Sequence, residues 1–373
     1  MKIVFKCVSV IAGVVIMASV FGSGCATKSE KQVGHGGADM EKGKFLNTEL
    51  RYENSFSKIM DISWEYMRAK RTEPQPEVAL PVNQITADQL KKAESPVLYR
   101  LGHSSVLIKL DGDFFLTDPV FSERSSPVQW AGPKRFHDTP LVIEDLPPLK
   151  AVVISHDHYD HLDKDTVKKL SDKAEWFVTP LKVGQRLIDW GLDPKKVIEK
   201  DWWQSVQLGS VKLVATPAQH FSGRGMFDKD ETLWASWVIQ GEQANLFFSG
   251  DSGYFSGFKE IGERYGPFDI TMIETGAYNE MWSEIHMLPE QSVQAHLDLK
   301  GRAMLPIHNS TFDLALHDWY EPLERVSAAA ELNQVRLLTP IMGEQVSITK
   351  PAQSIAWWLE LVDQPGEESL VAN

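Results

Sequence analysis

The sequence predicts a layered α/β domain, and two observations support that prediction. Short apolar runs alternate with helical patterns from residue 97 onward, and no linker interrupts residues 95–345. One of these runs, AVVIS at 151–155, is almost continuously apolar, which is typical of a strand buried on both faces. Strands that alternate with helices form layers of sheet and helix, so we expect one large α/β domain.

Three closely spaced runs open the predicted sheet, at residues 97–102, 104–110 and 113–118. Asp111-Gly112 separates the second run from the third, and this dipeptide is typical of a two-residue hairpin turn. Further strands are expected, in chain order, at 151–155, 175–179, 211–216, 233–240, 245–250, 268–274 and 302–307. So many strands close together exceed what a simple doubly wound sheet contains.

Helical patterns fill several of the intervals between these strands. Asp163 stands at an N-cap position, because its carboxylate can accept hydrogen bonds from the first backbone N–H groups of a helix. Pro289 suits a first turn, where its missing N–H costs nothing. The expected helices span 163–172, 181–190, 256–264, 289–299 and 321–332.

The amino terminus has the pattern of a targeting signal. Lys2 and Lys6 precede an uncharged apolar run at 8–21, which is shorter than the ~20 residues that a membrane-spanning helix requires. Small residues then lead to Cys25. This arrangement resembles a bacterial lipoprotein signal, in which residues 1–24 are removed and Cys25 is lipidated. It implies a lipid-anchored protein of the bacterial cell envelope, facing the periplasm or the exterior. An uncleaved anchor and plain secretion are the alternatives.

The rest of the chain divides into a tether and a domain. Residues 25–48 are polar and Gly-rich with few large apolar side chains, so we expect a flexible tether there. Residues 49–373 form the predicted domain, whose core spans about 95–345. Its composition, with 43% hydrophobic and 24% charged residues, is that of a globular protein.

Charge and cysteine content limit the possible functions. The net charge of −13 argues against a nucleic-acid partner, because phosphate backbones require a basic surface. Two Cys exclude a disulfide framework and a Cys-rich zinc module. A metal held by this chain would therefore need His and carboxylate ligands.

One segment contains such ligands at high density. Ser155-His156-Asp157-His158-Tyr159-Asp160-His161 follows directly after the 151–155 strand, where ligands gather in α/β folds. In an extended turn His156 and His158 point the same way, while Asp160 and His161 can reach a second point. Imidazole and carboxylate are the ligands that Zn²⁺ takes in the absence of thiolate. This single loop could therefore serve two metals.

Two metals need more ligands than one loop supplies. Three further positions share the same context, the end of an expected apolar strand: His220, Asp251 and His308. Glycines on both sides of Asp251 would allow the backbone to turn sharply beside a metal.

The chain resembles the metallo-β-lactamase superfamily, whose signature is His-x-His-x-Asp-His followed by a distant His, Asp and His. Within it, the resemblance is closest to the N-acylphosphatidylethanolamine-hydrolysing phospholipase D family. Matching segments run in order from residue 101 to residue 312 and include LGHSSVLIKL, AVVISHDHYDHLD, TPAQHFSGR, HMLPEQSV and PIHNSTF.

The resemblance implies a four-layer αββα sandwich with a dinuclear zinc site. The zinc ligands would be His156, His158 and His220 for one ion, Asp160, His161 and His308 for the other, and Asp251 as the bridge. Asp160, Asp251 and His286 would carry the catalysis. Asp118 would support the metal-binding loop from behind. His286 would bind the substrate phosphate or protonate the leaving alcohol.

The leading functional hypothesis is a zinc-dependent hydrolase of a phosphodiester, with phospholipase D-like action on N-acylphosphatidylethanolamine-type lipids. Lys134 and Arg135, in a Gly-Pro loop, are candidate contacts for an anionic head group. A lactonase or other ester hydrolase, a non-enzymatic envelope lipoprotein and a nuclease are the alternatives, the last disfavoured by the acidic charge. Fe or Mn could replace Zn²⁺. We interpret the remaining histidines of the domain as structural: His103, His137, His296 and His317.

Overall fold

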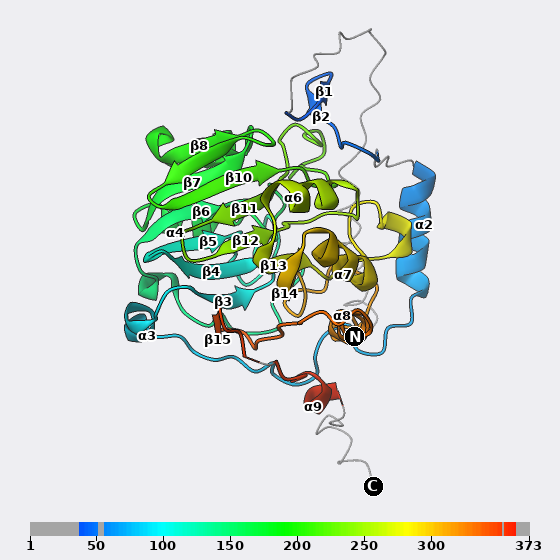
Figure 1. Cartoon of the computed structure of the whole chain (residues 1–373). Helices are drawn as coiled ribbons and strands as arrows, with labels where there is room; N and C mark the ends of the chain where they lie inside the picture. Colours follow the sequence, from blue (N-terminus) through cyan, green and yellow to red (C-terminus); the bar gives the residue numbers. More distant parts are fainter. Residues whose placement is uncertain (1–36, 51–55, 353, 363–373) are drawn as a thin grey trace.

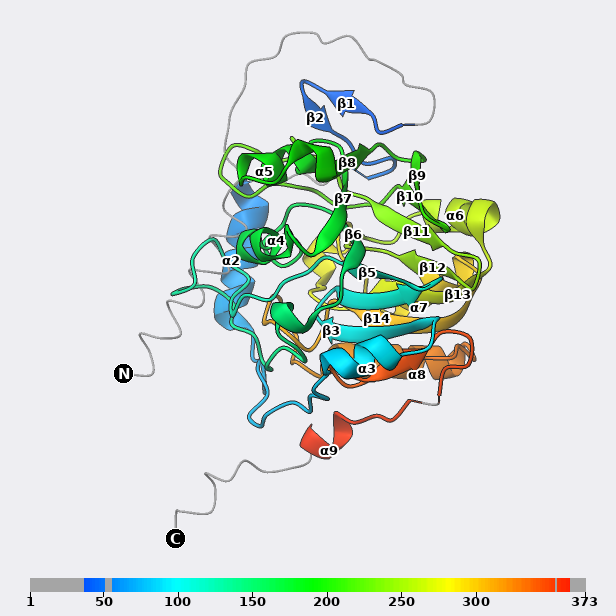
Figure 2. The ribbon, with the colours of Figure 1, turned by 90° about the vertical axis from the view of Figure 1, so that its left-hand side faces the viewer.

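The computed structural model describes residues 37–50, 56–352 and 354–362, and two β-sheets packed face to face form its centre (Figure 1). Helices cover the outer face of each sheet, which gives four layers in the order helix, sheet, sheet, helix (Figure 2). The α/β class and the αββα sandwich implied by the metallo-β-lactamase resemblance are both confirmed.

The first sheet has seven strands in the order β15-β3-β4-β5-β6-β7-β8, and β5 to β8 run parallel. Between β4 and β5, Asp111 and Gly112 have φ values of 52° and 88°, as a type I′ hairpin requires, so the predicted turn is confirmed. The strands are β3 (Val97–Gly102), β4 (Ser105–Leu110), β5 (Asp113–Thr117), β6 (Leu149–Val153), β7 (Ala174–Pro180), β8 (Val197–Lys200) and β15 (Gln345–Ser347).

The second sheet has six strands in the order β14-β13-β12-β11-β10-β9. Strand β11 begins at Ser236, whereas the sequence pattern predicted a start at residue 233. The residues before Ser236 bond to loops of the other sheet instead: the N–H of Leu233 donates to the carbonyl of Leu181, and the N–H of Ala235 to the carbonyl of Ser155. The strands are β9 (Ser205–Leu208), β10 (Val211–Thr216), β11 (Ser236–Gln240), β12 (Asn245–Phe248), β13 (Phe268–Glu274) and β14 (Gly301–Ile307).

The predicted helices all form, close to their expected ranges. Asp163 accepts a hydrogen bond from the N–H of Asp165 at the start of α4, and Pro289 is the first residue of α7. The helices that cover the sheets are α3 (Ala87–Lys92), α4 (Lys164–Leu170) and α5 (Val183–Asp189) on one side, with α6 (Gly257–Tyr265), α7 (Pro289–Asp298) and α8 (Glu321–Leu332) on the other.

Several elements have no counterpart in the predicted pattern. Strands β8, β9 and β15 lie at or near the sheet edges, where partial exposure weakens the apolar pattern. The others are β1 (Met40–Glu41), β2 (Lys44–Phe45), α2 (Phe56–Arg68), α3, α9 (Leu359–Val362), and the 3₁₀ helices η1 (Ile143–Asp145), η2 (Pro194–Lys196) and η3 (Glu280–Trp282).

Strand β6 shows why the chain forms layers. Ala151 and Val153 are fully buried between the two sheets, whereas Val152 and Ile154 are fully buried under the helices of the first sheet. Successive side chains of a strand point to opposite faces, so an apolar residue at every position requires cover on both sides. The interpretation of AVVIS as a doubly buried strand is confirmed.

The strand directions bring distant segments to one edge of the sandwich. Strands β3, β5, β6, β10, β12, β13 and β14 all run toward that edge, as their parallel and antiparallel pairings require. Their carboxyl ends therefore place the loops that follow them next to one another.

The amino-terminal segment corrects one expectation. Residues 40–45 form the β1–β2 hairpin, and Phe45 is buried in the core between the sheets. The flexible tether expected over 25–48 is therefore wrong for its final part, because the buried ring of Phe45 and hydrogen bonds from Phe45 and Asn47 dock that part on the domain. Residues 1–36, with Cys25 and the signal, lie outside the described residues. Among those described, no helix is long and apolar enough to cross a bilayer.

Candidate metal centre

The loop after β6 contributes the first group of candidate ligands. His156 Nε2 lies 2.8 Å from His158 Nδ1, and His220 Nε2, from the loop after β10, lies 3.3 Å from the same atom. Three imidazole nitrogens thus face one point, as expected for the residues assigned to the first metal.

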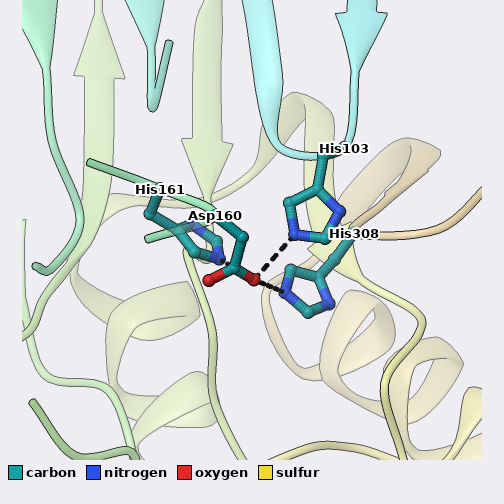
Figure 3. A group of neighbouring side chains, drawn as sticks. All are labelled: His103, Asp160, His161 and His308. Carbon is teal, nitrogen blue, oxygen red and sulfur yellow. Dashed lines mark hydrogen bonds and ion pairs between the residues drawn. The ribbon is translucent and has the colours of Figure 1, made fainter. Parts of the chain in front are cut away.

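A second group forms around Asp160 (Figure 3). The Asp160 Oδ2 atom lies 3.5 Å from His161 Nε2. It lies 3.2 Å from Nε2 of His308, the residue that follows β14. His103, in the turn between β3 and β4, also approaches this oxygen, with its Nε2 at 3.0 Å. His156 and His158 thus face the first group and Asp160 and His161 the second, because the carbonyl oxygen of His158 accepts from the N–H groups of His161 and Leu162 and turns the chain between them.

Asp251 lies between the two groups. Its Oδ2 atom is 3.1 Å from both His161 Nε2 and His308 Nε2 of the second group. The same oxygen is 3.9 Å from His156 Nε2 and 3.8 Å from His220 Nε2 of the first group. This position is the one that a ligand shared by two metals would take.

The spacing of these atoms fits divalent metals. Nitrogen ligands at about 2.0–2.1 Å from a tetrahedral Zn²⁺ lie about 3.3 Å from one another. The nitrogens of His156, His158 and His220 approach that spacing, with distances of 2.8 and 3.3 Å to the shared His158 Nδ1. In addition, the buried Oδ1 atom of Asp251 has no hydrogen-bond partner within the described part of the chain.

The charges at the site also favour cations. Burial by itself would lower the pKa of His308, but Asp251 and Asp160 outweigh it and raise that pKa to about 10. The same two carboxylates raise the pKa of His161 against the effect of its burial. Protons on imidazoles thus balance a local excess of carboxylate charge, and a metal ion would balance it instead.

Asp118 supports the second group of ligands through hydrogen bonds. It follows β5, is fully buried, and accepts hydrogen bonds from the Ser155 N–H and from His161 Nδ1–H, both at 2.7 Å. Because His161 donates through Nδ1, its Nε2 is free to coordinate a metal. Burial raises the pKa of Asp118, while the hydrogen bond from His161 opposes that shift. The position of Asp118 agrees with the supporting role implied by the resemblance.

His220 is oriented in the same way by other partners. Its Nδ1 lies 2.9 Å from the carbonyl oxygen of Ile285, so Nδ1–H donates there and Nε2 remains available. Asn47, just beyond β2, accepts from the His220 backbone N–H at 3.0 Å and donates to the His220 carbonyl at 2.7 Å. The amino-terminal segment therefore helps to hold this candidate ligand in place.

His286 also lies at the cluster. Its ring centroid is 5.1 Å from that of His220 and 5.5 Å from that of His308. Its Nδ1 forms a hydrogen bond with Oε1 of Glu274, the last residue of β13. Burial, with the negative charge of Asp251 nearby, raises the pKa of Glu274 well above its usual range.

Sequence reasoning missed two members of this site. His103, interpreted as structural, contacts Asp160, although its position at the end of an apolar strand was the same signal that identified His308. Glu274 likewise ends an apolar strand, but no motif surrounds it. The other three histidines do have structural partners, which are Thr311 for His137, Thr271 for His296 and the Ala277 N–H for His317.

The structure does not bring Lys134 or Arg135 to the metal ligands. Lys134 is exposed and pairs with Glu123 at 2.8 Å. Arg135 is directed inward, where its guanidinium lies over the ring of Phe312, 5.0 Å from the centroid. Phe312 in turn packs against His103, so the described contacts of Arg135 support the site from outside.

Comparisons with known proteins agree with this geometry. Residues 114–309 match the family model described as beta-lactamase superfamily domain. An uncharacterised protein of Mycobacterium tuberculosis is 39% identical over 370 residues, covering 94% of this chain and 96% of that protein. A Caenorhabditis elegans protein named N-acyl-phosphatidylethanolamine-hydrolyzing phospholipase D 1 is 36% identical over 283 residues, covering 71% of this chain and 79% of its own.

A solved structure supports the fold. Igni18, a metallo hydrolase from the archaeon Ignicoccus hospitalis, superposes with a TM-score of 0.52 at 22% identity, covering 67% of this chain and 97% of that one. The chain therefore belongs to the beta-lactamase superfamily as a metal-dependent hydrolase of that fold, and it is related to the N-acylphosphatidylethanolamine-hydrolysing phospholipases D.

Proposed function

We propose that this protein is a zinc-dependent phosphodiesterase with phospholipase D-like action on N-acylphosphatidylethanolamine-type lipids. The observation that carries the proposal is the position of His286 next to the rings of both His220 and His308, beside two groups of candidate metal ligands that Asp251 joins. The 36% identity to a nematode enzyme named for this activity supports the choice of substrate.

In this proposal each group of ligands holds one metal ion. His156, His158 and His220 would hold one ion, Asp160, His161 and His308 the other, and Asp251 both. Metal held by these residues would supply positive charge for the anionic phosphodiester and would lower the pKa of a bound water from 15.7 toward about 7. Asp118 keeps His161 in the coordinating tautomer, and His103 holds the carboxylate of Asp160.

His286 would act on the substrate itself. Its side chain is 14% exposed, whereas the side chains of His161, His220 and His308 are at most 1% exposed. An imidazole at the accessible side of the cluster can reach the oxygen of a leaving alcohol. Cleavage on that side of phosphorus would release an N-acylethanolamine and leave a phosphatidic acid.

A lipid substrate agrees with the proposed location. We propose that Cys25 is lipidated after removal of residues 1–24, which would attach the domain to a membrane of the bacterial cell envelope. Mass spectrometry of the mature amino terminus tests this part separately. An unmodified Cys25, or an intact signal, would rule it out.

The test of function uses purified protein reconstituted with Zn²⁺, Fe²⁺ or Mn²⁺ and vesicles that contain N-acylphosphatidylethanolamine. Mass spectrometry should detect N-acylethanolamine and phosphatidic acid in equal amounts. Asp251→Asn should abolish this activity and reduce the bound metal, while Asp172→Asn, at an exposed position, should leave both unchanged. Turnover of a lactone panel without lipid cleavage would instead favour a lactonase.

A further inference from the structure

Glu274 links two parts of the candidate site. It is the last residue of β13, and its side chain is fully buried. One carboxylate oxygen, Oε2, accepts from the backbone N–H of Ser252 at 2.6 Å, one residue after Asp251. The other, Oε1, meets Nδ1 of His286. A single side chain thus connects the loop of the bridging candidate Asp251 with the partly exposed imidazole of His286.

Such a placement is costly and needs a reason. A carboxylate removed from water loses several kcal/mol of hydration unless charge or hydrogen bonds replace it. A second buried carboxylate, Asp251, lies close enough to Glu274 to share a potential metal site, so their charges repel. A neutral residue would pack in this position at lower cost, which indicates that the carboxyl group serves the site rather than stability.

The contact with Glu274 determines what His286 can offer. With Nδ1 engaged, Nε2 is the remaining ring nitrogen. When His286 is protonated, its Nδ1–H donates to the carboxylate of Glu274 and its second N–H stands at Nε2, so the carboxylate stabilises the form of the imidazole that can donate a proton. The rings of His220 and His308 lie beside the imidazole, with centroids 5.1 and 5.5 Å from its own. The pair therefore presents a fixed N–H donor.

We infer that Glu274 is a positioning residue that holds His286 as the proton donor to the leaving alcohol, and so suits the enzyme to phosphodiesters of weakly acidic alkyl alcohols. The inference rests on the proposed function and deepens it. In the reaction, a water oxygen bonds to phosphorus and the P–O bond to the alcohol breaks. The Nε2 proton of His286 moves to the departing oxygen, and the proton released by the water restores His286.

Two matched substrates test this role. Bis(p-nitrophenyl) phosphate has an acidic leaving group that departs without a donated proton, whereas the N-acylethanolamine of the lipid requires one. Glu274→Gln should lower kcat on the lipid about 100-fold, the usual contribution of a general acid, and change kcat on the nitrophenyl ester less than about threefold. His286→Gln should show the same split, and the double variant should be no slower than His286→Gln alone.

Other outcomes have distinct meanings. Equal losses on both substrates, or a double variant slower than either single one, would overturn the role of Glu274. A wild-type enzyme inactive on both phosphodiesters would overturn the proposed function and, with it, this inference. If Glu274→Gln does not fold, Glu274→Asp keeps the carboxyl group one methylene farther away. It should show a smaller loss confined to the lipid, and the absence of such a split would equally contradict the inference.

Discussion

Replacement of Asp118 by Asn tests how the second ligand group is held. Asp118 accepts three hydrogen bonds, from the N–H and Oγ of Ser155 and from Nδ1 of His161. The amide of Asn can still accept from Ser155, but its NH₂ group cannot accept the Nδ1–H of His161. The imidazole then loses the partner that fixes its tautomer and keeps Nε2 directed at Asp160 and Asp251.

The expected loss is in metal affinity rather than in folding. Removal of a carboxylate that orients a metal-bound imidazole typically weakens binding 10- to 100-fold, which corresponds to about 1.4–2.8 kcal/mol. The metal-free protein should change little, because burial already disfavours the charge of Asp118 and raises its pKa. The variant should therefore approach wild-type stability without metal and fall below it when metal is bound.

Competition with a chromophoric chelator measures the affinity, and thermal unfolding with and without Zn²⁺ measures the stability. Asp163→Asn is the matched control, because this buried carboxylate accepts from Ser122 N–H and Asp165 N–H and contacts no histidine of the site. It should cost about 1 kcal/mol of stability as a lost helix cap and leave metal affinity unchanged. Wild-type affinity in Asp118→Asn would refute the reasoning.

Four further measurements address other parts of the molecule. Phe45→Ala should lower the free energy of unfolding by about 3 kcal/mol in urea titrations, and unchanged stability would show that the β1–β2 hairpin is not docked. Asn47→Ala should reduce metal content without comparable unfolding, since it frees the backbone of His220. Burial lowers the pKa of His296 to about 4, below its unfolded value of about 6.5. The contribution of neutral His296 to the free energy of unfolding is therefore complete above pH 6.5, and it is lost at about 1.4 kcal/mol per pH unit as the pH falls toward 4. In His296→Gln the free energy of unfolding, measured by denaturant titration, should differ less between pH 7 and pH 5 than in the wild type. Metal loading at pH 7 should release protons, because the raised pKa of His308 means that a proton must leave before coordination; calorimetry in buffers of different ionisation enthalpy would detect no release if this is wrong.

Short local sequence patterns were sufficient to predict several structural features of this protein. The Asp111-Gly112 turn, the N-cap at Asp163 and the doubly buried β6 depend on short-range geometry, so a few adjacent residues predict them. The division of the loop after β6 is also local, because the carbonyl oxygen of His158 accepts from the N–H groups of His161 and Leu162 and turns the chain within a few residues. These features are properties of neighbouring residues, and folding changed none of them.

The remaining features depend on segments that are far apart in the chain. Asn47 and Glu274 carry no local motif, and each reaches the site only because segments far apart in the chain meet at one edge of the sandwich. Composition predicted a tether around Phe45, because one apolar side chain scarcely changes the average hydrophobicity of a polar segment. In the structure that side chain packs in the core between the sheets. The sequence by itself thus determined which residue types could bind metal, whereas tertiary structure decided which groups orient them, because hydrogen bonds between distant segments exist only after the sheets pack.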